Sequence, residues 1–168
     1  YKLDMATGAK TVISRELMVA GIALNFDGSF VFAGGTGLHL WNDQDNYRTI
    51  LFEHHGEELF FNDILADPAG RLYAGTRYWG PNGVAKRGKL YLVDTDGSVR
   101  VRDEGFELAN GMGLNPQNTV LYVADTLART IYAYDVDPDT ALLSNKRVFI
   151  TTSDDEGLPD GLAVDSEG

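Results

Sequence analysis

The sequence predicts an all-β fold, in which four-stranded antiparallel sheets repeat as the blades of a β-propeller. Three observations support this prediction. Apolar residues fall in short alternating runs, turns rich in glycine, asparagine and aspartate separate those runs, and one nine-residue pattern recurs along the chain. No segment shows the sustained periodicity of an amphipathic helix, so strands are expected to be the main elements.

The recurring pattern is a short strand of small and branched apolar residues that leads into a polar turn. Its copies begin 42, 48 and 50 residues apart, which is a spacing typical of propeller blades. Further strand-like runs follow each of the first three copies. The repeat therefore predicts three complete blades, at residues 20–53, 62–103 and 110–151.

Both ends of the chain fit the same repeat as partial blades. Residues 1–15 have the pattern of the two outer strands of one blade, and residues 160–168 have that of the inner strand of the next. Open sheet edges invite pairing, and blades bury their faces only against neighbours. We therefore expect either that the chain is a fragment or that it self-associates through its open blade edges.

The charge of the chain argues against two classes of partner. The formal net charge is −11, and such a field repels nucleic-acid phosphates and anionic lipids. No apolar run reaches the roughly 18 residues that indicate a membrane-spanning helix. We therefore expect no nucleic-acid partner and no membrane partner.

Cysteine is absent from the sequence, which excludes disulfides, thiolate zinc sites and cysteine nucleophiles. This composition fits the cytoplasm, which is the expected location. Export stays open, because a signal peptide would be missed if the native N-terminus precedes Tyr1.

Polar residues occupy the same position, the first, in three of the four copies of the repeat. Ala20 occupies it in the first copy, and Asn62, Asn110 and Asp160 occupy it in the others. This position starts the innermost strand of a blade, so side chains from successive blades can converge at one mouth of the central channel. One carboxylate and two amide oxygens suit a hard cation such as Ca²⁺, or Mg²⁺ or Mn²⁺. The alternative is that each residue only caps its own turn.

Several stretches of the sequence resemble the SMP-30/gluconolactonase/LRE-like family, to which the regucalcins belong. Three motifs carry the resemblance: FND at 61–63 with DPAGRLYAGT at 67–76, NGM at 110–112 with LYVADT at 121–126, and PDG at 159–161. Their order and spacing are kept from Gly56 to Gly168, which makes the likeness specific. Residues 1–55 match only as generic blades.

The resemblance implies a six-bladed propeller that hydrolyses sugar lactones or related esters with one divalent cation at the channel mouth. It implies that Asn110 and Asp160 are metal ligands and that Asn62 contacts the substrate or a metal-bound water. Asp160 is then the catalytic carboxylate that takes a proton. The expected partner is a small-molecule lactone, and the expected cation is calcium, with zinc, magnesium or manganese as alternatives.

Two positions depart from the family pattern. A further glutamate ligand of the family lies ahead of the place where Tyr1 begins, and Phe60 stands where sugar lactonases often have an arginine. The metal shell within this chain is therefore incomplete. The alternative function is a catalytically incomplete propeller that binds a metal or ligand, or an acidic scaffold for a protein partner.

A long connection within the second blade, residues 77–88, offers further candidates. It joins a second strand to a third and so lies on the same face as Asn62. Tyr78 and Trp79 are expected to contact the substrate as a lid over a sugar ring, because aromatic rings combine apolar area with a polar edge. The alternative is an ordinary hairpin that packs its aromatic rings onto the blade.

Other polar residues give less specific signals. The pair His54 and His55 lies in an acidic stretch and is interpreted as part of a solvated loop. The acidic run 154–156 is interpreted in the same way. Asp125 ends a second strand near the predicted channel mouth, where a role in supporting the site and a role in a turn are equally open.

Overall fold

A computed structural model describes residues 1–12, 15, 17–43 and 46–168 of the protein. Strands are the regular elements throughout these ranges, and they form antiparallel pairs. The predicted all-β fold of four-stranded antiparallel sheets is therefore confirmed. The described residues contain no helix that is long and apolar enough to cross a bilayer.

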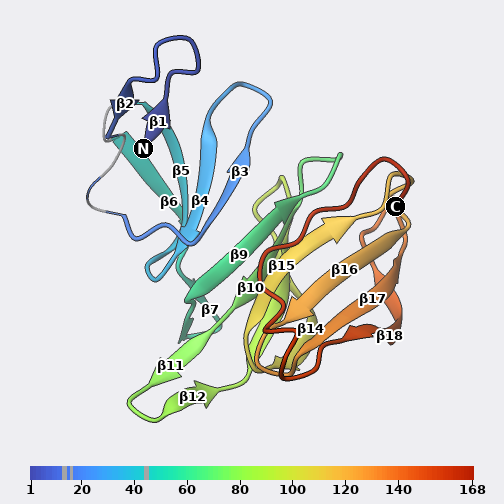
Figure 1. Ribbon diagram of the computed structural model, residues 1–168. Helices are drawn as coiled ribbons and strands as arrows, with labels where there is room; N and C mark the ends of the chain where they lie inside the picture. The colour runs from blue at the N-terminus through green and yellow to red at the C-terminus, as the bar shows by residue number, and fades with distance from the viewer. Residues whose placement is uncertain (13–14, 16, 44–45) are drawn as a thin grey trace.

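Three four-stranded sheets make up most of the molecule (Figure 1). The first sheet consists of β3 (Gly21–Leu24), β4 (Phe30–Gly34), β5 (Gly37–Asp43) and β6 (Asn46–Leu51). The middle sheet consists of β9 (Phe61–Ala66), β10 (Leu72–Thr76), β13 (Gly88–Val93) and β14 (Val99–Phe106). The third sheet consists of β15 (Ala109–Leu114), β16 (Val120–Asp125), β17 (Thr130–Val136) and β18 (Leu143–Thr151). In each sheet, strands that follow one another along these lists are hydrogen-bonded neighbours.

Three short hairpins accompany the sheets. They are β1 (Lys2–Leu3) with β2 (Lys10–Thr11), β7 (Glu53–His54) with β8 (Glu57–Glu58), and β11 (Tyr78–Gly80) with β12 (Gly83–Lys86). The hairpin β11–β12 is inserted between β10 and β13. It projects from the end of the middle sheet where β9 begins (Figure 1).

The C-terminal segment differs from its expected form. Residues 160–168 were predicted to form an inner strand, but no strand is assigned to them. The segment lies along β15, where the Gly111 N–H donates to the Asp160 carbonyl at 3.1 Å. A strand is defined by a ladder of such bonds, and this segment lacks one. The division of the chain into blades otherwise stays a prediction.

The strands β3, β9 and β15 lie side by side, with β9 in the centre (Figure 1). Small residues permit this approach. A Cβ added to Gly21 would lie 3.0 Å from the Asp63 Oδ1 atom on β9, and one added to Gly75 would lie 2.8 Å from the Ala109 Cβ atom on β15. Larger side chains at these places would push neighbouring sheets apart. The close spacing brings the N-terminal ends of the inner strands together.

Two apolar clusters fill the spaces between neighbouring sheets. One joins the first sheet to the middle sheet and includes the fully buried Phe61 and Tyr91, and the other joins the middle sheet to the third and includes Tyr73 and Leu121. Truncating a buried aromatic residue of this kind to alanine costs about 3–5 kcal/mol. The cores therefore fix the relative position of the inner strands.

A buried arginine adds a polar link between the middle and third sheets. The Arg71 Nε atom lies 2.6 Å from the Asp67 Oδ2 atom in an ion pair that is almost fully buried. The two other nitrogens of Arg71 donate to the carbonyls of Asp139 and Pro138, both at 2.6 Å. Residues 67–71 are the DPAGR motif. The structure thus assigns this motif a role in joining the sheets.

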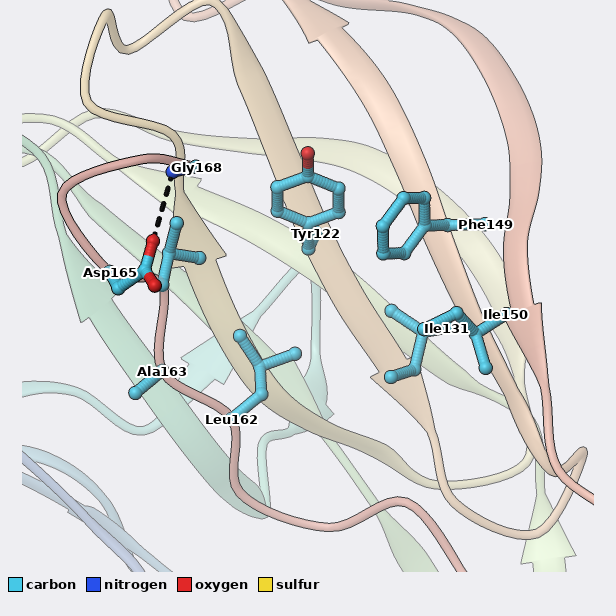
Figure 2. Close-up of a pocket in the computed structure, with 9 residues that line it drawn as sticks. Tyr122, Ile131, Phe149, Ile150, Leu162, Ala163, Asp165 and Gly168 are labelled. Carbon is cyan, nitrogen blue, oxygen red and sulfur yellow. Dashed lines mark hydrogen bonds between the residues drawn. The ribbon is translucent and has the colours of Figure 1, made fainter.

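The outward face of the third sheet carries a cavity of about 350 Å³. Figure 2 shows Tyr122, Ile131 and Phe149 on one side of it and Leu162 of the C-terminal segment on the other. The Asp165 carboxylate in this cavity accepts the Gly168 N–H at 3.1 Å. The lining is otherwise mostly apolar. The cavity is therefore a gap between the face of the third sheet and the C-terminal segment, and it is not a site with reactive groups.

Candidate active site

The candidate residues Asn62, Asn110 and Asp160 form a connected row across the inner strands. Asn62 and Asn110 are each the second residue of their strand, β9 and β15. The Asn62 Nδ2 atom donates to the Ala109 carbonyl at 3.1 Å, and the Gly111 N–H donates to the Asp160 carbonyl at 3.1 Å. The three residues that share a position in the repeat are therefore brought to one end of the sheets.

Both asparagines lie at irregularities in the strand pairing. Asp63 pairs with Gly75 and Phe61 pairs with Thr76, which leaves Asn62 as an extra residue between them. On β15 the register shifts between Ala109 and Met112, around Asn110. Such β-bulges turn a side chain out of the regular alternation of a strand. The bulges are a local feature that aims the two amides.

Each asparagine has its amino group occupied and its oxygen available. The Asn110 Nδ2 atom donates to the Thr126 Oγ1 atom at 3.0 Å, while the Asn62 Nδ2 atom donates to Ala109. No protein donor reaches either Oδ1 atom within the described residues. An amide held in this way presents its oxygen, which is the atom that binds hard cations and substrate hydroxyl groups.

Asp160 is exposed, and its carboxylate makes no hydrogen bond or ion pair within the ranges that the structure covers. Its backbone is fixed by close contact with Gly111. A Cβ at Gly111 would collide with the Asp160 carbonyl and would lie 2.5 Å from the Leu162 backbone nitrogen. Glycine at this position is what allows Asp160 to approach Asn110.

Asp63 is a neighbour of the site that the sequence interpretation did not include. Its Oδ1 atom accepts the Ile64 N–H at 2.8 Å and faces Gly21 of β3. Burial raises the pKa of the Asp63 carboxyl above its ordinary value; the Ile64 bond opposes this, and the charge of Asp160 adds to the rise. A second carboxylate thus interacts with Asp160. Its signal in the sequence was the FND motif, where it directly follows Asn62.

Asp125 supports the strand that carries Asn110. Its carboxylate is buried and accepts the N–H groups of Glu107 and Leu108 at 3.0–3.1 Å. These bonds fix the turn that leads into β15, and the next residue, Thr126, holds the Asn110 amide. Of the two roles left open for Asp125, the structure shows the turn role and a position that also supports the site.

Tyr78 and Trp79 lie on β11, at the same end of the middle sheet as the start of β9. The Tyr78 hydroxyl donates to the Glu57 Oε1 atom at 2.6 Å, and its ring meets Phe60 edge to face with a centroid separation of 6.1 Å. The Trp79 ring is half exposed. Tyr78 thus lies against Phe60, two residues before Asn62, and the contact of Tyr78 and Trp79 with substrate stays a prediction.

Glu57 anchors this hairpin through its charge. Burial disfavours its ionised form, but hydrogen bonds from Lys86, Tyr78 and Lys89 outweigh that effect and lower the pKa of Glu57 to about 2. Two ammonium groups and one hydroxyl therefore converge on a single carboxylate. The hairpin is tied to β8 and β13 rather than hanging free.

The remaining polar candidates lie outside this row. The His54 ring meets Tyr91 edge to face, and burial lowers its pKa. Asp154 pairs with Arg129 at 3.1 Å. The described part of the chain contains no group of three or more His, Cys, Asp or Glu side chains placed to hold a metal ion. Any cation at the candidate site therefore depends on the asparagine oxygens.

Comparison with known proteins gives these features a context. The sequence profile of the SMP-30/Gluconolactonase/LRE-like region matches residues 1–168. A pentonolactonase of Haloferax volcanii is 34% identical over all of this chain and 56% of its own length, and the regucalcin of Danio rerio is 38% identical over 93% of this chain and 53% of its own. The chain spans just over half the length of these curated relatives.

Solved structures agree with this grouping. A calcium-binding regucalcin from Agrobacterium tumefaciens has a TM-score of 0.83 at 27% identity, over 99% of this chain and 56% of its own length. A luciferin-regenerating enzyme has a TM-score of 0.79 at 28% identity, over 93% of this chain and 55% of its own. The resemblance inferred from the motifs is confirmed, and the chain belongs to the SMP-30/gluconolactonase/LRE-like family.

Proposed function

We propose that this chain carries the metal-binding and substrate-binding residues of a divalent-metal-dependent sugar-lactone hydrolase. The observation that carries the proposal is the row of Asn62, Asn110 and Asp160, whose two amide oxygens and one carboxylate have no partner among the described residues. The named relatives include a pentonolactonase, which supports a lactone as the class of substrate. A small-molecule lactone is accordingly the proposed partner.

The donor set fits a hard divalent cation. Asn110 and Asp160 are the proposed ligands, and calcium is the proposed ion, with magnesium, manganese or zinc as alternatives. A bound cation would offset the repulsion between the carboxylates of Asp63 and Asp160, which interact in the structure. When bound, the ion supplies a Lewis acid that polarises the lactone carbonyl.

Residues of the chain orient the substrate and transfer the proton. Asn62 orients the substrate through its free amide oxygen, which accepts a hydroxyl of the sugar. The Asp160 carboxylate takes a proton from the attacking water as the water oxygen bonds to the carbonyl carbon. The bond from that carbon to the ring oxygen then breaks, and the ring oxygen receives the proton. The product is the open-chain hydroxy acid.

Lactone hydrolysis with and without added calcium tests this proposal. We expect Asp160→Asn to reduce turnover of glucono-δ-lactone at least a hundredfold and to remove the rise in melting temperature that calcium produces. The matched control is Asp155→Asn, since Asp155 is exposed and accepts a hydrogen bond from Ser153 within its own loop. If both variants respond to calcium as the unmodified protein does, the assignment of Asp160 is wrong.

A second function is favoured by one observation. The described residues hold no group of three or more His, Cys, Asp or Glu side chains placed to hold a metal ion. This fits a module that binds a metal or ligand without turnover. Calcium binding that needs Asp160, together with no hydrolysis of any γ- or δ-lactone, would support this function over the first.

A further inference from the structure

A second pocket, with a volume of about 480 Å³, lies beside the candidate site. Phe60, Arg77, Tyr78, Trp79 and Lys86 contribute to its lining. The Arg77 N–H donates to the Phe60 carbonyl at 2.8 Å, which fixes the base of the pocket two residues before Asn62. The pocket therefore belongs to the same end of the sheets as the proposed lactone site.

The guanidinium of Arg77 has no partner in this pocket. The residue is half-buried, yet its side chain makes no hydrogen bond or ion pair within the described ranges. Arg87, ten residues further on, shows the ordinary arrangement, because its Nη1 atom lies 2.8 Å from the Glu107 Oε1 atom. An anionic ligand group would supply the counter-charge that Arg77 lacks within the described residues.

The carboxylate that anchors this hairpin is already occupied. Glu57 is held between Lys86 and Lys89 and also accepts the Tyr78 hydroxyl. Its two oxygens are therefore shared among three donors, and they leave no counter-charge for Arg77. This excess of positive charge stands out in a chain whose net charge is −11. An anionic ligand group is the chemistry that complements it.

The aromatic residues give the pocket a second property. Lys86 lies over the Tyr78 ring with its Nζ atom 4.9 Å from the centroid, and Phe60 packs against the edge of the same ring. The Trp79 ring is 50% exposed. Aromatic surface of this kind packs against the C–H groups of a sugar. A sugar that carries an anionic group would use both properties together.

We propose that this pocket is a subsite for an exocyclic anionic group of an acidic sugar, held by Arg77 beside Trp79. The inference rests on the proposed function, since it selects acidic lactones over neutral ones as the preferred substrates. The anionic group is a carboxylate, as in the lactone of a sugar diacid, or a phosphate ester. Both bind a guanidinium through two parallel hydrogen bonds.

Tryptophan fluorescence tests the subsite without requiring turnover. The chain has two tryptophans, and Trp41 is almost fully buried among Phe30 and Phe32, away from the pocket. We expect glucuronate or glucose 6-phosphate to change the fluorescence of Trp79 in a saturable manner, and glucose to have no effect. Trp79→Phe should abolish the change. The stronger of the two acids identifies the carboxylate or the phosphate as the group that is bound.

Variants of Arg77 and Arg87 give the decisive comparison. We expect Arg77→Gln to weaken binding of the acidic sugar at least tenfold and Arg77→Lys to restore part of it, while Arg87→Gln leaves it unchanged. Melting curves establish that each variant is folded. Equal effects of Arg77→Gln and Arg87→Gln, equal binding of glucose, or no binding of either acid would each overturn the proposal.

The anion subsite and the proposed hydrolase function can be disproved separately. Asp160→Asn is expected to lose turnover and the response to calcium, but to keep the binding of the acidic sugar. If that variant behaves like the unmodified protein while Arg77→Gln loses anion binding, the subsite stands and the metal site does not. The reverse pattern would leave the hydrolase proposal in place and remove the subsite.

Discussion

The two junctions between neighbouring sheets are built differently. Between the middle and third sheets, Arg71 reaches the carbonyls of Pro138 and Asp139, and Asn62 reaches that of Ala109. Ser29 and Ala20 hold the corresponding positions in the first sheet. Ser29 bonds within its own turn, and the Ala20 N–H donates to the Ala33 carbonyl of the same sheet.

The difference shows how one repeat serves two purposes. Both junctions have an apolar cluster and closely packed inner strands. At the junction between the middle and third sheets, polar side chains bond from one sheet to the other. This junction carries the candidate site, and the bonds fix the relative position of Asn62 and Asn110. The fold supplies the position, and the residue at the first place of the repeat decides whether a polar side chain occupies it.

Replacing Arg71 should have the largest effect on stability. Arg71→Met leaves the buried Asp67 carboxylate without its cation, and such a loss costs about 3–5 kcal/mol of the free energy of unfolding. Ser29→Ala, at the matching position in the first sheet, should cost about 1 kcal/mol. Urea unfolding of both variants measures the difference. Equal losses would show that the two junctions are not distinct.

Enlarging Gly111 should separate Asp160 from Asn110. Gly111→Ala places a Cβ against the Asp160 carbonyl, and we expect it to cost about 1–3 kcal/mol and to weaken the response to calcium. Gly161→Ala is the control, because a Cβ there meets nothing within 4 Å. Melting curves with and without calcium report both effects. An unchanged calcium response in Gly111→Ala would contradict the assigned role of this contact.

Exchanging the residues at the first position of the repeat sharpens the comparison between junctions. Asn62→Ala removes the bond to the Ala109 carbonyl and should cost about 1 kcal/mol. Ala20→Asn should change the free energy of unfolding by less than about 0.5 kcal/mol, because residue 20 is exposed. Chemical denaturation measures both. A larger loss for Ala20→Asn would mean that the first junction also constrains this position.

The smallest expected effect concerns pH. The pKa of Glu57 falls from an ordinary 4.5 to about 2 in the folded protein. A lowered folded pKa stabilises the protein above the unfolded pKa, and this contribution is lost as the pH falls from about 4.5 toward 2. Glu57→Gln should therefore be about 0.5–1 kcal/mol less stable than the unmodified protein at pH 7 and nearly equal to it at pH 2. A gap that stays constant over this range would contradict the charged tether.

Sequence periodicity determined the all-β fold and the phase of its repeat, because alternation and turn chemistry are local properties. The motifs determined the family. The same phase identified Asn62, Asn110 and Asp160 as a set, and their roles toward metal and substrate stay predictions. The expected self-association and the cytoplasmic location also stay predictions.

Only the tertiary structure decided which atoms are available for chemistry. It placed Asp63 near Asp160. Within the part of the chain that it describes, it gave both amide oxygens no protein donor and Arg77 no counter-charge. It also showed residues 160–168 running alongside β15 without a strand ladder. These features depend on contacts between residues far apart in the chain. Periodicity reports which face a side chain occupies, whereas its hydrogen-bond partners are set by what packs against that face.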